Sequence, residues 1–85
     1  MIYNVLVFER SESGKETLQS VAPSFTAKQN AIDHALSYTT ENGYYLDSIM
    51  GENDPITEVY LVRENPRRLY NRGGLTIYIV ETELY

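Results

Sequence analysis

Apolar residues follow a two-residue period in several stretches of the chain, which is the pattern of β-strands. Residues 2–10 alternate imperfectly and are rich in β-forming side chains, which predicts a central strand covered on both faces. After a turn at 11–15, the more polar residues 16–22 can return as the second strand of a hairpin. Three further strands are predicted over 44–50, 56–63 and 75–84.

A helix is predicted between the second and third strands. Pro23 to Thr26 should stop the second strand, and Thr26 with Gln29 has the spacing of a capping box. Asn42 and Gly43 should end the helix, because glycine readily forms a left-handed C-terminal cap. Between these signals, small and apolar residues recur at the spacing of one helix face: Ala27, Ala31, Ile32, Ala35, Leu36 and Thr39.

These elements predict an α+β fold in the order ββαβββ. One helix would pack on one face of an antiparallel four- to five-stranded sheet. The 85 residues form a single domain, 1–85, because the chain is long enough for one modest hydrophobic core and too short for two.

The last two predicted strands are apolar on both faces, although one helix can cover only one of them. In the strand 56–63, Val59 and Leu61 share one face, and Ile56, Tyr60 and Val62 share the other. The strand 75–84 repeats this pattern, with Tyr78 on the second face. If Tyr3, Tyr60 and Tyr78 lie away from the helix, they form a tyrosine-rich surface suited to a partner. The alternative is that sheet curvature buries these side chains locally.

Four of the seven positive charges fall within one predicted loop, 63–72. The four arginines and Glu64 give this segment a charge of +3. The rest of the chain carries −8, so the net charge is −5. Arginine suits bidentate contacts with carboxylates or phosphates. We therefore expect one partner-binding surface made of Arg63, Arg67, Arg68, Tyr70 and Arg72, joined by Tyr60 and Tyr78. The alternative is that these arginines pair with the chain's own carboxylates.

The acidic balance changes the interpretation of the arginine segment. A dedicated nucleic-acid binder is usually basic, whereas this chain has a pI near 4.7, so direct nucleic-acid binding is disfavoured. The acidic groups could instead imitate a phosphate backbone, or they could only provide solubility. They include Glu9, Glu12 and Glu16 around the first turn and Glu52, Asp54 and Glu58 around the second.

Catalytic and metal-binding patterns are missing from the sequence. The single histidine, His34, lies within the predicted helix and fits a solvated surface position. There are no cysteines, and no short ligand motif suggests a metal or a cofactor. No apolar run reaches the roughly 20 residues that span a bilayer. We expect a cytoplasmic protein that is not an enzyme and has no catalytic residues, metal, cofactor or membrane contact.

The layout is similar to that of some small phage-encoded inhibitors of bacterial defence, the anti-CRISPR proteins. The likeness lies in an opening hairpin, a Thr26-Ala27 helix start, and a last strand preceded by residues 68–72, Arg-Leu-Tyr-Asn-Arg. It implies an acidic inhibitor that blocks a nucleic-acid-binding defence complex, and no binding residue follows from it.

The expected function is thus a small acidic inhibitor or adaptor that occupies a partner's surface without catalysis. A weak nucleic-acid or phosphate-ligand binding module that uses the loop 63–72 remains the alternative. A homodimer through the sheet is also left open by the sequence.

Overall fold

The computed structural model describes residues 1–63 and 73–83. Its elements in chain order are β1 (Ile2–Arg10), β2 (Glu16–Phe25), α1 (Lys28–Glu41), β3 (Tyr45–Met50), β4 (Ile56–Val62) and β5 (Gly74–Thr82). The five strands form one antiparallel sheet in the order β2-β1-β5-β4-β3. The predicted α+β class and ββαβββ order are therefore confirmed, and the last strand, β5, is the central one.

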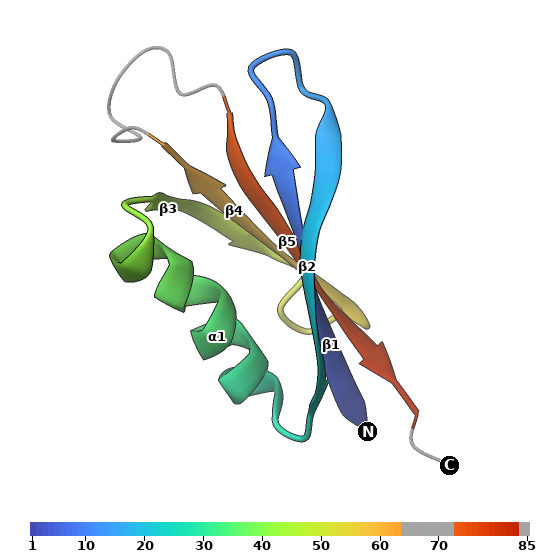
Figure 1. Ribbon diagram of the computed structural model, residues 1–85. Coiled ribbons are helices and arrows are strands. Elements are labelled where there is room, and N and C mark those ends of the chain that lie inside the picture. Colours follow the sequence, from blue (N-terminus) through green and yellow to red (C-terminus); the bar gives the residue numbers. More distant parts are fainter. Residues whose placement is uncertain (64–72, 84–85) are drawn as a thin grey trace.

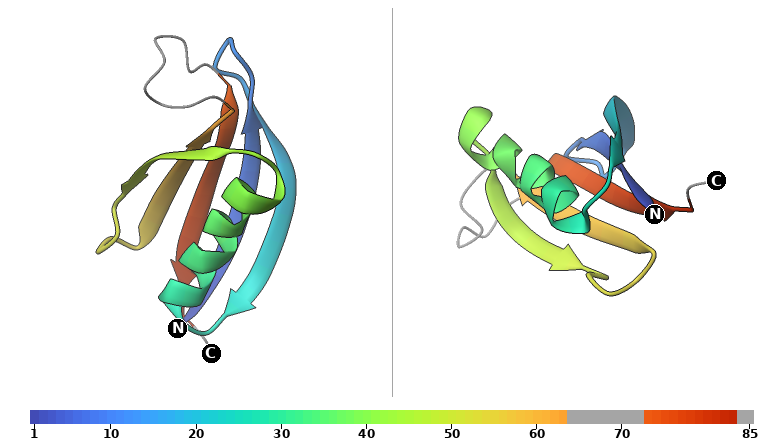
Figure 2. Two further views of the ribbon diagram at one scale, coloured as in Figure 1. Left: turned by 90° about the vertical axis from the view of Figure 1, so that its left-hand side faces the viewer. Right: turned by 90° about the horizontal axis from the view of Figure 1, so that it is seen from below.

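The helix α1 runs along one face of the strongly twisted sheet (Figures 1 and 2). Its buried residues are Ala31 and Ala35, which are small enough to bring the helix axis close to the strands. Ile32 and Leu36 pack beside them against the core. The predicted helical stripe is confirmed at these four positions, whereas Ala27 is exposed.

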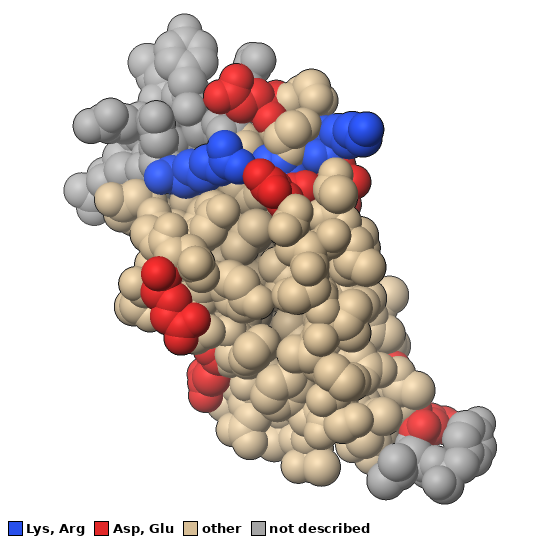
Figure 3. All heavy atoms as spheres, viewed as in Figure 1, with Lys and Arg blue, Asp and Glu red and all other residues tan. Residues whose placement is uncertain are grey.

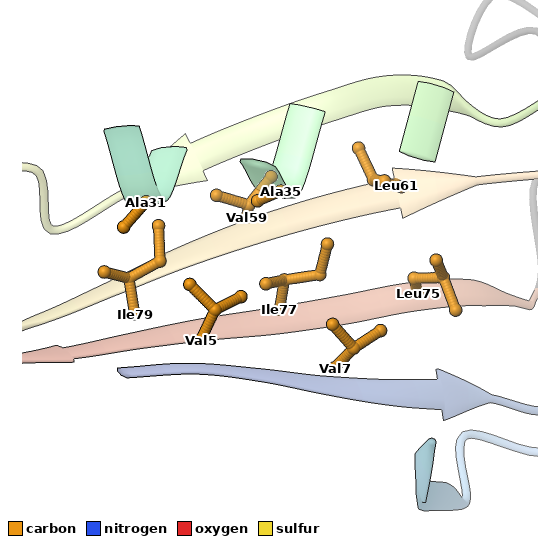
Figure 4. Packing of buried hydrophobic residues seen from close by; sticks show 9 residues of the cluster. All are labelled: Val5, Val7, Ala31, Ala35, Val59, Leu61, Leu75, Ile77 and Ile79. Carbon is orange, nitrogen blue, oxygen red and sulfur yellow. The ribbon is translucent and has the colours of Figure 1, made fainter. Parts of the chain in front are cut away.

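The hydrophobic core fills the space between α1 and the three inner strands. Figure 4 shows the two helix alanines pointing toward side chains of β1, β4 and β5. Every strand residue of this cluster comes from an odd-numbered position, as expected for one face of a pleated strand. The buried strand residues are Val5, Val7, Val59, Leu61, Leu75, Ile77 and Ile79.

The second strand is longer than the sequence predicts. It continues through Pro23 to Phe25, so the prediction that Pro23 to Thr26 stops it was wrong. β2 is an edge strand, and there a proline need not donate to the ladder. Ser24 takes a positive φ of 71°, and its N–H is accepted by Asn4 Oδ1 at 3.2 Å. The Asn4 side chain on β1 thus holds the irregular stretch of β2 around Ser24 in place.

The helix start also differs from the prediction. The helix begins at Lys28 with Ala27 as its N-cap and no capping side-chain hydrogen bond, so the capping box at Thr26 and Gln29 is not formed. Lys28 instead donates to the backbone oxygen of Asp54 at 3.0 Å, which ties the helix start to the β3–β4 turn. The end agrees with the prediction, because Asn42 is the C-cap residue.

Candidate functional site: the open face of the sheet

The sheet face that points away from α1 is the candidate site, and we call it the open face. No other described helix or strand covers it (Figure 2). Four of its apolar side chains, Leu18, Val21, Met50 and Ile56, are between 50% and 56% exposed. The strand registers place these apolar and aromatic residues on it: Leu6, Phe8, Leu18, Val21, Met50, Ile56, Tyr60, Val62, Tyr78 and Val80.

A fixed arginine occupies one end of the open face. Arg10 Nη1 donates to the hydroxyl of Thr76 at 2.9 Å, and Nη2 donates to the backbone oxygen of Leu61 at 3.3 Å. Its guanidinium carbon lies 5.9 Å from the centre of the Tyr60 ring. Hydrogen bonding and the cation–π contact together hold the charge against the sheet.

Two tyrosines stand beside this arginine, and each donates to a carboxylate. Tyr60 Oη donates to Glu58 Oε2 at 2.9 Å, and Tyr78 Oη donates to Glu16 Oε2 at 3.3 Å. The hydrogen bond to Glu58, aided by burial, raises the pKa of Tyr60 to about 12. Burial and the nearby charge of Glu16 also raise the pKa of Tyr78. Both phenols are therefore protonated donors at neutral pH.

Two aromatic rings of the open face meet across the neighbouring strands β1 and β5. The Phe8 and Tyr78 rings meet edge to face, with their centres 5.4 Å apart. The register pairs Leu6 with Tyr78 and Phe8 with Thr76 on neighbouring strands. The centre of the open face is thus aromatic, with polar groups held at fixed positions.

Two of the three tyrosines that the sequence grouped as a possible surface lie on the same face of the sheet. Tyr60 and Tyr78 lie on the open face, on the neighbouring strands β4 and β5. Tyr3 instead packs against the core on the helix side, so the expectation that it joins them was wrong. Its odd position in β1 puts it on the face of Val5, which the sequence pattern could have indicated.

The structure does not bring Arg63 together with the two tyrosines. Arg63 Nη2 lies 2.6 Å from Glu9 Oε1, and Glu9 shares the helix-side face of β1 with Val7. Gln19 donates to the other oxygen of the Glu9 carboxylate at 2.9 Å. The remaining predicted contact residues, Arg67, Arg68, Tyr70 and Arg72, lie outside the described residues.

Three polar residues of the open face were not identified from the sequence as members of one site. They are Arg10, Glu16 and Glu58, which come from three different strands. Arg10 is at an even-numbered position of β1, as are Leu6 and Phe8. The alternation of side chains along a strand therefore indicates that it lies on the same face as they do. The positions of the three polar residues on one face depend on the pairing of β1 with β2 and of β5 with both β1 and β4, which no local pattern gives.

Charged side chains of both signs gather where β1 turns into β2, and the other visible surface carries fewer (Figure 3). The Arg63–Glu9 ion pair has side chains that are 50% and 43% exposed. An ion pair this exposed contributes little stability, typically about 0 to 1 kcal/mol.

A small pocket lies on the helix side. Its volume of about 190 Å³ is below the roughly 300 Å³ at which drug-sized ligand sites begin. Val7 and Leu75 line it together with polar side chains from β1, β2 and the helix end. The pocket is therefore a weaker candidate than the open face.

Metal-binding side chains do not cluster in residues 1–63 and 73–83. No group of three His, Asp or Glu side chains in this part could hold a metal ion. The His34 ring centre is 5.3 Å from that of Phe25 and 5.9 Å from that of Tyr38, and the histidine is half-buried between these rings. No helix in the described part is long and apolar enough to cross a membrane.

The fold defines an α+β protein in which the one helix of the described residues packs on one face of the sheet. No protein-family model matches the chain, and neither a curated protein nor a solved structure shows significant similarity to it. The functional argument therefore depends on the residues of the open face.

Proposed function

We propose that the protein is a small inhibitor or adaptor that occupies a partner protein's surface without catalysis, and that the open face makes the contact. The proposal is carried by this apolar face, which no helix or strand in residues 1–63 and 73–83 covers. A sheet face bearing Leu18, Val21, Met50 and Ile56 at half exposure is typical of an interaction surface. Tyrosine suits such a surface because it combines apolar area with a hydrogen-bonding group.

The sheet edges are less suited to a partner than the face. The β1–β2 pairing has two register shifts, and the edge strand β2 contains Pro23. The other edge strand, β3, has a shift around the exposed Asp47. Bulges, prolines and charges at an edge hinder the addition of another strand. A contact through the face is therefore favoured over strand addition.

The phosphate-binding alternative has less support. The charge of Arg63 is balanced by Glu9, and Arg10 already bonds to Thr76 and Leu61. Glu16 and Glu58 would repel a phosphate backbone laid across the open face. The partner in this proposal is thus a protein, met in the cytoplasm. The nucleic-acid-binding defence complex that the sequence resemblance implies is one such protein partner.

Affinity capture from the native host tests the use of the open face. The wild type is compared with the double variant Met50→Ser and Ile56→Ser, and with the control Leu46→Ser. Leu46 is a matched control because it is 41% exposed but pairs with Leu61 on the helix-side face. The double variant should lose the captured partner while the control keeps it. Equal capture by all three proteins would contradict the proposal.

A second comparison tests the arginine segment, which stays a prediction. Charge reversal of Arg67 and Arg68 to Glu should slow association and speed dissociation with little loss of stability. Unchanged binding would remove this segment from the contact surface and leave the open face in place.

A further inference from the structure

The open face carries two carboxylates and one arginine that is already engaged. Glu16 and Glu58 each accept one tyrosine hydroxyl. In the described part of the chain, neither carboxylate lies within ion-pair distance of a cation, and the one ion pair found there is Arg63 with Glu9. The face therefore carries acceptors for positive charge.

We infer that the partner presents a lysine or arginine side chain, flanked by apolar residues, to Glu58 and Glu16 on the open face. This inference rests on the proposed function and adds the chemistry of the partner. The first reason is the kind of group that the carboxylates can bind. An ionised carboxylate only accepts hydrogen bonds, and each has a second oxygen beyond the one bonded to tyrosine. A partner group that contacts them must be a donor, and a cation is the strongest one.

The second reason is that the carboxylates are held in position. The Tyr60 hydroxyl fixes Glu58, and the Tyr78 hydroxyl on β5 fixes Glu16 on β2, across the intervening strand β1. A positioned acceptor loses less conformational entropy on binding than a free glutamate side chain does. The tyrosines therefore act as positioning residues for a charged contact.

The third reason is the apolar surface around the charges. The register places Glu58 between Met50 on β3 and Tyr78 on β5. Leu18 and Val21 extend the apolar surface on the β2 side. An aliphatic stem with a terminal cation matches this arrangement, because lysine and arginine bury their stems while the charged end stays at the surface.

Charge complementarity also selects against a second copy of this chain. The chain carries a net charge of −5, so two copies repel each other at long range. Two open faces brought together would also oppose their carboxylates, while Arg10 is committed to Thr76 and Leu61. A basic protein surface is attracted by the same field, which speeds its association.

Amide NMR titrations with two small probes test the inference. Butylguanidinium has the stem and cation of arginine, and butylurea is its neutral analogue of nearly the same shape. At low salt, we expect butylguanidinium to shift signals of open-face residues and to bind at least about threefold more tightly than butylurea, a modest ratio for an exposed charge contact. The double variant Glu16→Gln and Glu58→Gln should remove this preference.

Controls separate misfolding from lost binding. Glutamine can still accept the tyrosine hydroxyl, so the variants should keep dispersed spectra, and the single variants can be used if the double variant does not. Glu41→Gln on α1 is the matched control and should keep the preference. Equal affinity for the two probes, shifts confined to the helix side, or no shifts with either probe would overturn the inference. The proposed function would then still stand if the Met50 and Ile56 variant loses the captured partner.

Discussion

Gly74 lies opposite Arg10 in the register between β5 and β1, and its lack of a side chain is what allows the arginine to be bound where it is. A Cβ atom at this position would collide with the backbone oxygen of Leu61, the same atom that accepts a hydrogen bond from Arg10. Gly74 also has a φ of +147°, which L side chains rarely adopt. The arginine contact on the open face thus depends on a glycine in the central strand.

Gly74→Ala should therefore destabilise the protein by about 3 kcal/mol or more, through backbone strain and the clash with β4. Urea unfolding measures the loss. Gly14→Ala is the control, because Gly14 has a φ of +89° but an alanine Cβ there would meet no neighbouring atom within 4 Å. It should cost only about 1 kcal/mol. Equal losses at both sites would contradict the clash.

Arg10 and Thr76 should be energetically coupled. Thr76 is fully buried, and its hydroxyl would lose the guanidinium donor in Arg10→Met. A double-mutant cycle with Thr76→Val should give a coupling free energy of about 1 kcal/mol. The free energies of unfolding come from urea titrations of the four proteins. Purely additive losses would mean that the hydrogen bond adds nothing to stability.

Tyr60 should deprotonate later than an ordinary tyrosine. Its pKa is raised from 10.0 to about 12 because the neutral phenol donates to Glu58. The folded state therefore binds this proton more tightly than the unfolded state. The resulting stabilisation is complete below pH 10 and is lost as the pH rises from 10 to about 12.

The ultraviolet absorbance of phenolate during an alkaline titration measures this shift. Glu58→Gln should move one tyrosine transition to lower pH, since the charge that disfavours the phenolate is removed. Glu41→Gln on the helix should leave the curve unchanged. An unchanged curve for Glu58→Gln would contradict the assignment.

The Arg63–Glu9 ion pair should contribute little to stability. Both side chains are about half exposed, so Glu9→Gln should cost less than about 1 kcal/mol, and high salt should reduce the difference. Urea unfolding at low and high salt gives both values, with the exposed Glu12→Gln as the control. A loss that persists at high salt would show that the pair is a structural contact between β1 and the residue that follows β4.

The sequence predicted the elements better than their ends. β1 agrees with its predicted range, because a long run of β-forming residues strongly favours a strand. The end of β2 was missed because the effect of Pro23 depends on whether its strand lies at an edge. The helix start was missed because the capping side chains are replaced by a lysine contact to a turn distant in sequence.

The sequence alone determined that this protein has one helix, one sheet and two apolar sheet faces, since two- and 3.6-residue periods are local properties of the chain. It also put Tyr60 and Tyr78 each on the second apolar face of its own strand. The tertiary structure decided that Tyr60 and Tyr78 share the open face, that Arg63 pairs with Glu9, and that Glu16 meets Tyr78. These relations depend on strand order and register, which bring together residues far apart in the chain and are fixed only when the whole sheet assembles.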